Sequence, residues 1–160
     1  MLNDFTINGA CPAKNTRIAR SGSEIQLRRI VDPPGDTGGF LISTYKDAHT
    51  ARDVHRILID NGISTASPET SNCVLADYGL HIYSNIKSLV DKASTDRLGT
   101  PWTLVENRDS QVGYEKGTCP VADDLFDRSI ILTIPSCLTV QDENDIIAGF
   151  DRAMEELGAK

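Results

Sequence analysis

The C-terminal quarter of this 160-residue chain carries its most regular pattern. Pro120 suits the first position of a short helix, because proline lacks the N–H that this position leaves unpaired. An apolar strand follows over 129–134, and Thr139 and Asp142 then have the spacing of a helix cap. The apolar residues behind this cap repeat at helical spacing: Ile146, Ile147, Phe150, Met154 and Leu157. A buried strand between two helices predicts a sheet with helices packed on it.

The N-terminal half adds two strands and one helix to this pattern. Alternating and β-branched runs predict strands over 24–31 and 40–45, with a turn rich in Pro and Gly between them. Thr50 is the expected N-cap of the helix that follows, and Gly62 is expected to end it. The apolar stripe of this helix is Ala51, Val54, Ile57 and Leu58. The order of elements predicts an α+β fold, a small antiparallel or mixed sheet with helices packed on it.

Length and composition indicate one globular domain. A chain of 160 residues can bury one real core and is short for two. We expect a single domain over 24–160, preceded by a lead segment over 1–23 that lacks clear periodicity. No apolar run is long enough to span a bilayer, and the N-terminus lacks the apolar core of a secretory signal.

The net charge of -7 bears on the partners that the chain can have. A nucleic acid partner would need a basic surface, and an anionic membrane would repel an acidic protein, so neither partner is expected. The four cysteines, at positions 11, 73, 119 and 137, are far apart and form no C-x-x-C pair. This spacing favours reduced thiols in a cytoplasmic protein over a disulfide framework or a zinc site.

Motifs that carry chemistry are few. The chain has no dinucleotide-binding or P-loop glycine motif and no histidine pair at zinc spacing, so no metal site is expected. The acidic cluster over 123–127 is interpreted as a partner of the helix dipole rather than as an acid–base pair. His81, Tyr83 and Asn85 would share one side of an extended stretch and could meet a polar ligand. The alternative is an ordinary strand with a solvated polar face.

A long irregular segment over 94–117 separates the predicted elements. Loops of this length in a compact domain tend to be functional or mobile. Trp102 and Tyr114 lie in this segment and could cap a ligand by stacking on it. Packing of Trp102 in the core or in a lid is the simpler interpretation.

Three segments occur in a characteristic order: RRIVDPPGDTG at 28–38, a helix that ends in NGI at 61–63, and CPVADDL at 119–125 followed by IILTIP at 130–135 and LT at 138–139. Together they resemble the C-terminal small domain of the DegT/DnrJ/EryC1/StrS family of pyridoxal-phosphate-dependent sugar aminotransferases. The stretch over 76–85 resembles a subgroup that acts on amino-sugar or octulosonate substrates. The resemblance covers roughly residues 24 to 157, and it implies the fold of the small domain of fold-type I aminotransferases.

The resemblance also implies what to expect of the chemistry. In the family, a large domain supplies the lysine that forms a Schiff base with pyridoxal phosphate (PLP), and this chain is expected to stand without that domain. None of its six lysines lies in a stretch like the family's lysine motif, so no catalytic residue and no bound cofactor are expected. Only His81, Tyr83 and Asn85 match a region that approaches the substrate in the family.

Three functions remain open from the sequence. The first is a detached small domain without activity of its own, which would form a homodimer or larger homo-oligomer through the face it exposes. The second is a subunit of a split aminotransferase, completed by a separate large-domain chain. The third is a repurposed binding module for a small polar or sugar-nucleotide ligand, with Trp102 among its contacts.

Overall fold

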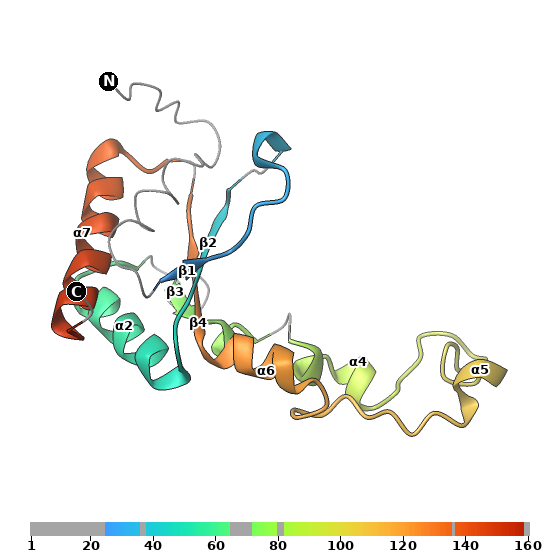
Figure 1. The fold of residues 1–160 in the computed structure, drawn as a ribbon. Coiled ribbons are helices and arrows are strands. Elements are labelled where there is room, and N and C mark those ends of the chain that lie inside the picture. The colour runs from blue at the N-terminus through green and yellow to red at the C-terminus, as the bar shows by residue number, and fades with distance from the viewer. Residues whose placement is uncertain (1–24, 36–37, 65–71, 80–81, 136, 159–160) are drawn as a thin grey trace.

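The fold is seen in a computed structural model that describes residues 25–35, 38–64, 72–79, 82–135 and 137–158 (Figure 1). The lead segment predicted over 1–23 lies outside these residues. No described helix combines the length and the apolar composition that a bilayer crossing requires.

The described strands form one antiparallel sheet of four strands in the order β1-β2-β4-β3. Their bounds are Gln26–Leu27 for β1, Phe40–Thr44 for β2, Asn72–Val74 for β3 and Ser129–Thr133 for β4. β4 pairs with β2 on one side and with β3 on the other. The apolar strand predicted near the C-terminus is therefore central and buried. The predicted α+β fold is confirmed, although β1 is much shorter than the strand expected over 24–31.

Two long helices pack on one face of the sheet and enclose the core (Figure 1). They are α2, Ala48–Asp60, and α7, Val140–Glu156. In β2, Leu41 and Ser43 are buried whereas Ile42 between them is only half-buried, as the two-residue alternation of a strand requires. The buried core comprises Ile25, Leu41, Tyr45, Ala51, Val54, Ile57, Leu58, Ile63, Ile130, Leu132, Phe150, Ala153 and Met154. The apolar stripes predicted for both helices supply six of these thirteen residues, and Leu157, predicted for the same face of α7, is exposed.

The start of α2 differs from the prediction. Asp47, not Thr50, is the N-cap, and its Oδ1 accepts a hydrogen bond of 2.7 Å from the Thr50 backbone N–H. Thr50 thus occupies the position that receives the cap, because an aspartate three residues earlier supplies a strong acceptor for the free N–H groups. The predicted end is confirmed, since Gly62 follows the helix with a φ of 77°.

Both C-terminal helices begin as predicted. α6 spans Pro120–Asp127 with proline in its first turn. α7 begins with a reciprocal capping box: the Thr139 side chain accepts from the Asp142 N–H, and the Asp142 carboxylate accepts from the Thr139 N–H at 2.7 Å. Further along α7, Gly149 allows a close approach to the end of α2, because a Cβ at that position would lie 3.0 Å from Ile63 Cγ1.

The caps make the stability of the fold depend on pH in the acid range. Hydrogen bonds from the backbone N–H groups of Thr50 and Thr139 lower the pKa of Asp47 and of Asp142 below the ordinary aspartate value. The carboxylates of Asp47 and Asp142 therefore take up protons at a higher pH in the unfolded chain than in the folded chain. The contribution of the two ionised caps to the free energy of unfolding is complete above about pH 4, and it is lost as the pH falls through their folded-state pKa values.

An Asp47→Asn variant tests this pH dependence, because asparagine caps a helix about as well as aspartate but does not titrate. We expect its free energy of unfolding to match that of the unsubstituted chain at pH 7 and to fall less between pH 5 and pH 2. Urea denaturation at each pH measures the difference. Identical acid profiles for the two proteins would contradict a lowered pKa at Asp47.

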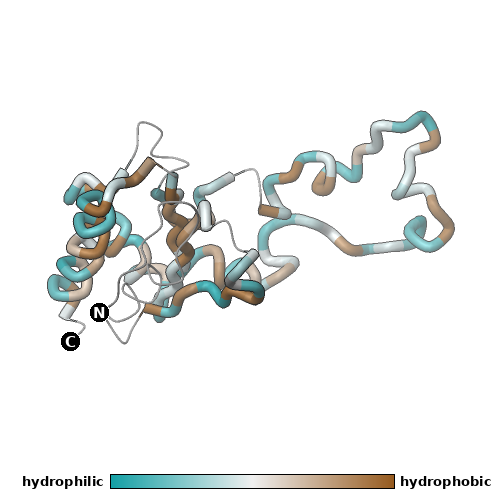
Figure 2. The backbone as a smooth tube through the Cα atoms, turned by 90° about the horizontal axis from the view of Figure 1, so that it is seen from above, coloured by the Kyte–Doolittle hydropathy of each residue, from teal (hydrophilic) through white to brown (hydrophobic). Residues whose placement is uncertain are grey.

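Between β3 and α6 the chain leaves the body of the fold as a long arm, defined here as residues 86–117 (Figures 1 and 2). Its regular parts are single turns, α4 at Lys87–Val90 and α5 at Val105–Arg108. The helical spacing of Ile86, Leu89, Val90 and Ala93 predicts a compact helix at this point of the chain, and the observed helix covers only one turn of it. α5 lies near the far end of the arm, away from the sheet (Figure 1).

Candidate functional site

The base of the arm is closed by a hydrogen-bonded cluster around a buried carboxylate. The Tyr83 hydroxyl donates to Asp123, with 3.0 Å to each carboxylate oxygen, and Asp123 is only 9% exposed. Asp123 Oδ2 also accepts from the Gly117 N–H at 2.7 Å, and the Cys119 N–H donates to the Tyr83 hydroxyl oxygen at 3.2 Å. We call this group the Tyr83–Asp123 clamp. It ties the two ends of the arm to the first turn of α6.

The clamp gives the acidic cluster of α6 a more specific role than the sequence indicated. Asp123 does lie in the first turn of the helix, where the dipole favours a negative charge. Asp124 accepts from Arg128 Nε at 2.7 Å, and Asp127 accepts from Lys116 Nζ at 3.1 Å. Asp123 is thus part of the arm base, whereas Asp124 makes a local pair within its own stretch of chain.

The predicted row of polar side chains is only partly realised. Ile82 is extended, but the chain then turns into a 3₁₀-helix over Tyr83–Asn85, so the extended stretch expected through Tyr83 is wrong. The cause is local: the Asn85 N–H bonds to the Ile82 carbonyl, and Asn85 Nδ2 donates to the Gly79 carbonyl at 3.1 Å. Tyr83 points its hydroxyl at Asp123 instead. His81 lies outside the described residues.

Trp102 and Tyr114 meet inside the arm. Their ring centroids are 5.9 Å apart at an interplanar angle of 66°, an edge-to-face contact that aromatic pairs favour. Trp102 Nε1 also donates to the Ala93 carbonyl at 3.1 Å. A small cavity of about 90 Å³ beside them is also lined by Asn107 and Val112. The indole therefore packs within the arm and holds its two runs together.

The outer surface of the arm exposes large apolar side chains. Leu98 is 79% exposed, Val105 75%, Val112 55% and Leu104 44%. Figure 2 shows the corresponding hydrophobic stretches along the open loop of the arm. The arm contains five basic and five acidic residues, so its net charge is zero and the charge of -7 resides in the rest of the chain. Exposed apolar side chains that gather on one surface mark a protein–protein contact.

No protein-family model matches this sequence, and no curated protein is similar to it. The likeness to the sugar aminotransferases accordingly rests on the sequence motifs alone. Among the described residues, no group of three or more histidine, cysteine, aspartate or glutamate side chains is placed to hold a metal ion.

The sequence held little signal for this site. Tyr83 and Asp123 are separated by 40 positions, and nothing in either local pattern pairs them. Over 94–117 the apolar residues show neither strand nor helix periodicity, so only Trp102, Tyr114 and the unusual length of the segment marked it.

Proposed function

We propose that this chain is a docking domain without catalytic activity of its own, related to the small domain of PLP-dependent sugar aminotransferases, and that the arm is its docking element. The observation that carries the proposal is the exposure of Leu98, Val105 and Val112 on an arm whose base is tied down by the clamp. Exposed apolar area is costly in water, and a fixed base lowers the entropy lost when a partner covers it.

The partner that we propose is a second copy of the chain, in a homodimer or larger homo-oligomer. Two bodies that each carry a net charge of -7 repel one another, whereas two arms of zero net charge can approach without that penalty. Within α5, Glu106 and Arg108 also place opposite charges beside the exposed Val105, so a symmetric contact can pair them across two arms.

Hydrogen bonds within the chain occupy the polar groups that were predicted to contact a substrate, and this supports a non-catalytic function. The Tyr83 hydroxyl, the Asn85 amide and the Trp102 indole N–H each have a partner within the chain. A lysine that forms a Schiff base is activated by desolvation or by a neighbouring cation. The four described lysines, Lys46, Lys87, Lys92 and Lys116, are all exposed.

A Val105→Asp variant tests the docking function, with Val31→Asp as its matched control. Both valines are highly exposed, at 75% and 85%, but only Val105 lies in the arm. We expect sedimentation velocity to show an oligomer for the unsubstituted chain and at least roughly tenfold weaker association for Val105→Asp, since burying a charge in an apolar contact costs more than 1.4 kcal/mol. Val31→Asp should associate normally.

Three results would contradict the proposal. The first is a monomer at the highest attainable concentration, and the second is an equal loss of association in both aspartate variants. The third is a stoichiometric adduct after incubation with PLP and borohydride, because such an adduct on one lysine would show cofactor chemistry in this chain. It would favour a split aminotransferase that is completed by a separate large-domain subunit.

A further inference from the structure

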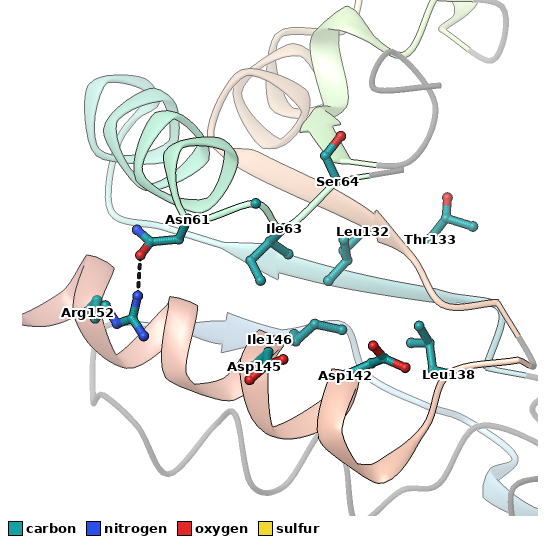
Figure 3. A pocket seen from close by; sticks show the side chains of 11 residues that line it. Asn61, Ile63, Ser64, Leu132, Thr133, Leu138, Asp142, Asp145, Ile146 and Arg152 are labelled. Carbon is teal, nitrogen blue, oxygen red and sulfur yellow. Dashed lines mark hydrogen bonds between the residues drawn. The ribbon is translucent and has the colours of Figure 1, made fainter. Parts of the chain in front are cut away.

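A second hollow lies between the end of α2, the end of β4 and α7 (Figure 3), and no residue of the arm lines it. Its volume is about 390 Å³, within the range of small-ligand sites. Ile63, Leu132 and Ile146 are among the described residues that line it, and they give it an apolar floor. We call it the α2–α7 cavity.

Charged side chains of opposite sign lie at different points along this cavity. Asp142 and Asp145 come from the start of α7, beside Leu138, and Arg152 comes from two turns further along the same helix (Figure 3). Arg152 follows Asp145 by seven positions in the α-helix, which corresponds to a rise of about 10 Å along the helix axis. The cavity is therefore dipolar, with a negative and a positive part joined by an apolar floor.

Each charged group makes a hydrogen bond within the chain that leaves capacity for a ligand. Arg152 donates through one nitrogen to Asn61 Oδ1, and a guanidinium has five N–H donors. Asp145 Oδ1 accepts from Gln141 Nε2 at 2.8 Å, and a carboxylate has about four acceptor sites. Asp142 is held in the capping box, so its negative charge is also positioned.

From this arrangement we infer that the α2–α7 cavity binds a short extended peptide, with its amino group at Asp145 and its carboxylate at Arg152. An extended chain spans about 3.4 Å per residue, so three residues cover the rise between the two helix positions that carry these side chains. A free α-amino acid is too short to reach both, and a polyamine would place a cation against Arg152. An apolar central side chain would pack on Ile63 and Ile146.

The test uses the full chain and the tripeptide alanyl-leucyl-alanine in three forms: with free ends, with an amidated C-terminus, and with an acetylated N-terminus. Peptide is titrated into the isotope-labelled protein while amide chemical shifts are recorded. We expect shifts at Ile63, Leu132 and Ile146 with the free peptide. Removing either end charge should weaken binding roughly tenfold, the effect of one charge-assisted hydrogen bond.

Two variants assign each end of the peptide. In Arg152→Gln, amidation of the peptide should no longer matter, and in Asp145→Asn, acetylation should no longer matter. Arg56→Gln is the matched control, because Arg56 is an exposed arginine of α2 that pairs with Asp60 outside the cavity. Thermal unfolding of each variant checks that it is folded.

The inference is overturned if the free peptide causes no shifts at the cavity residues in the millimolar range. It is also overturned if amidation weakens binding to Arg152→Gln as much as binding to the unsubstituted chain. Because neither Val105 nor any other arm residue lines this cavity, a failure here leaves the docking function of the arm untouched.

Discussion

Replacement of Phe150 by alanine is expected to lower the free energy of unfolding by about 3–5 kcal/mol. Phe150 lies in the middle of α7, is 1% exposed, and belongs to the core cluster that joins this helix to α2 and to the sheet. The substitution removes the apolar contacts of the ring and leaves a cavity, because Leu58 and Val54 of the same core cluster are fully buried and cannot collapse freely into the space. The total free energy of unfolding of a native domain is roughly 5–15 kcal/mol, so the expected loss is a large part of it.

Urea denaturation measures this effect through the midpoint of the transition at an unchanged slope. Val140→Ala on the same helix is the control: Val140 is 54% exposed, and its truncation should change stability by less than about 0.5 kcal/mol. Equal and small losses in both variants would mean that α7 does not cover the sheet as the fold requires.

The elements that the sequence predicted well are those whose signal is local. The capping box of Thr139 and Asp142, the proline that opens α6 and the apolar stripe of α2 each lie within a few residues, and all three are present. The central strand was predictable because a run of four buried residues in β4 leaves an apolar signature on both faces.

The elements that were missed depend on competition or on distant contacts. The helix starts at Asp47 rather than at Thr50 because both residue types can cap a helix and the sequence does not rank the two positions. The turn at Tyr83–Asn85 is closed locally by the Asn85 hydrogen bonds to the Ile82 and Gly79 carbonyls, whereas the partner of the Tyr83 hydroxyl, Asp123, lies far along the chain. Local propensity carries no information about such a partner.

In the candidate site, too, the sequence predicted local features and missed those that depend on contacts in the folded chain. Trp102 was marked by its residue type, but its edge-to-face partner and its bond to the Ala93 carbonyl became visible only in the folded arm. The exposure of Val105 and Leu98 could not be read from the sequence, because an apolar residue without periodicity is equally compatible with burial and with a surface.

The clamp at the base of the arm provides the second large effect. Tyr83→Phe removes the hydroxyl that donates to the buried Asp123 and accepts from the Cys119 N–H, and we expect it to cost roughly 1.5–3 kcal/mol, the range for hydrogen bonds to charged groups. Asp123→Ala should cost at least as much, since it also leaves the Gly117 N–H without its acceptor. Tyr114→Phe is the matched control, because its ring contact with Trp102 survives the loss of the hydroxyl.

The double variant decides whether these groups act together. If the clamp forms, Tyr83→Phe combined with Asp123→Ala should cost less than the sum of the two single losses, by roughly 0.5–3 kcal/mol. Hydrogen exchange at Gly117 and Cys119 should accelerate in each variant, because opening the clamp frees both amides, whereas exchange in β4 should follow global unfolding alone. Strict additivity of the two substitutions, with unchanged exchange at Gly117, would contradict a joint role.

A clamp that holds the arm also predicts that Tyr83→Phe weakens association of the chain while Tyr114→Phe does not, since a loosely attached arm loses more entropy when it docks.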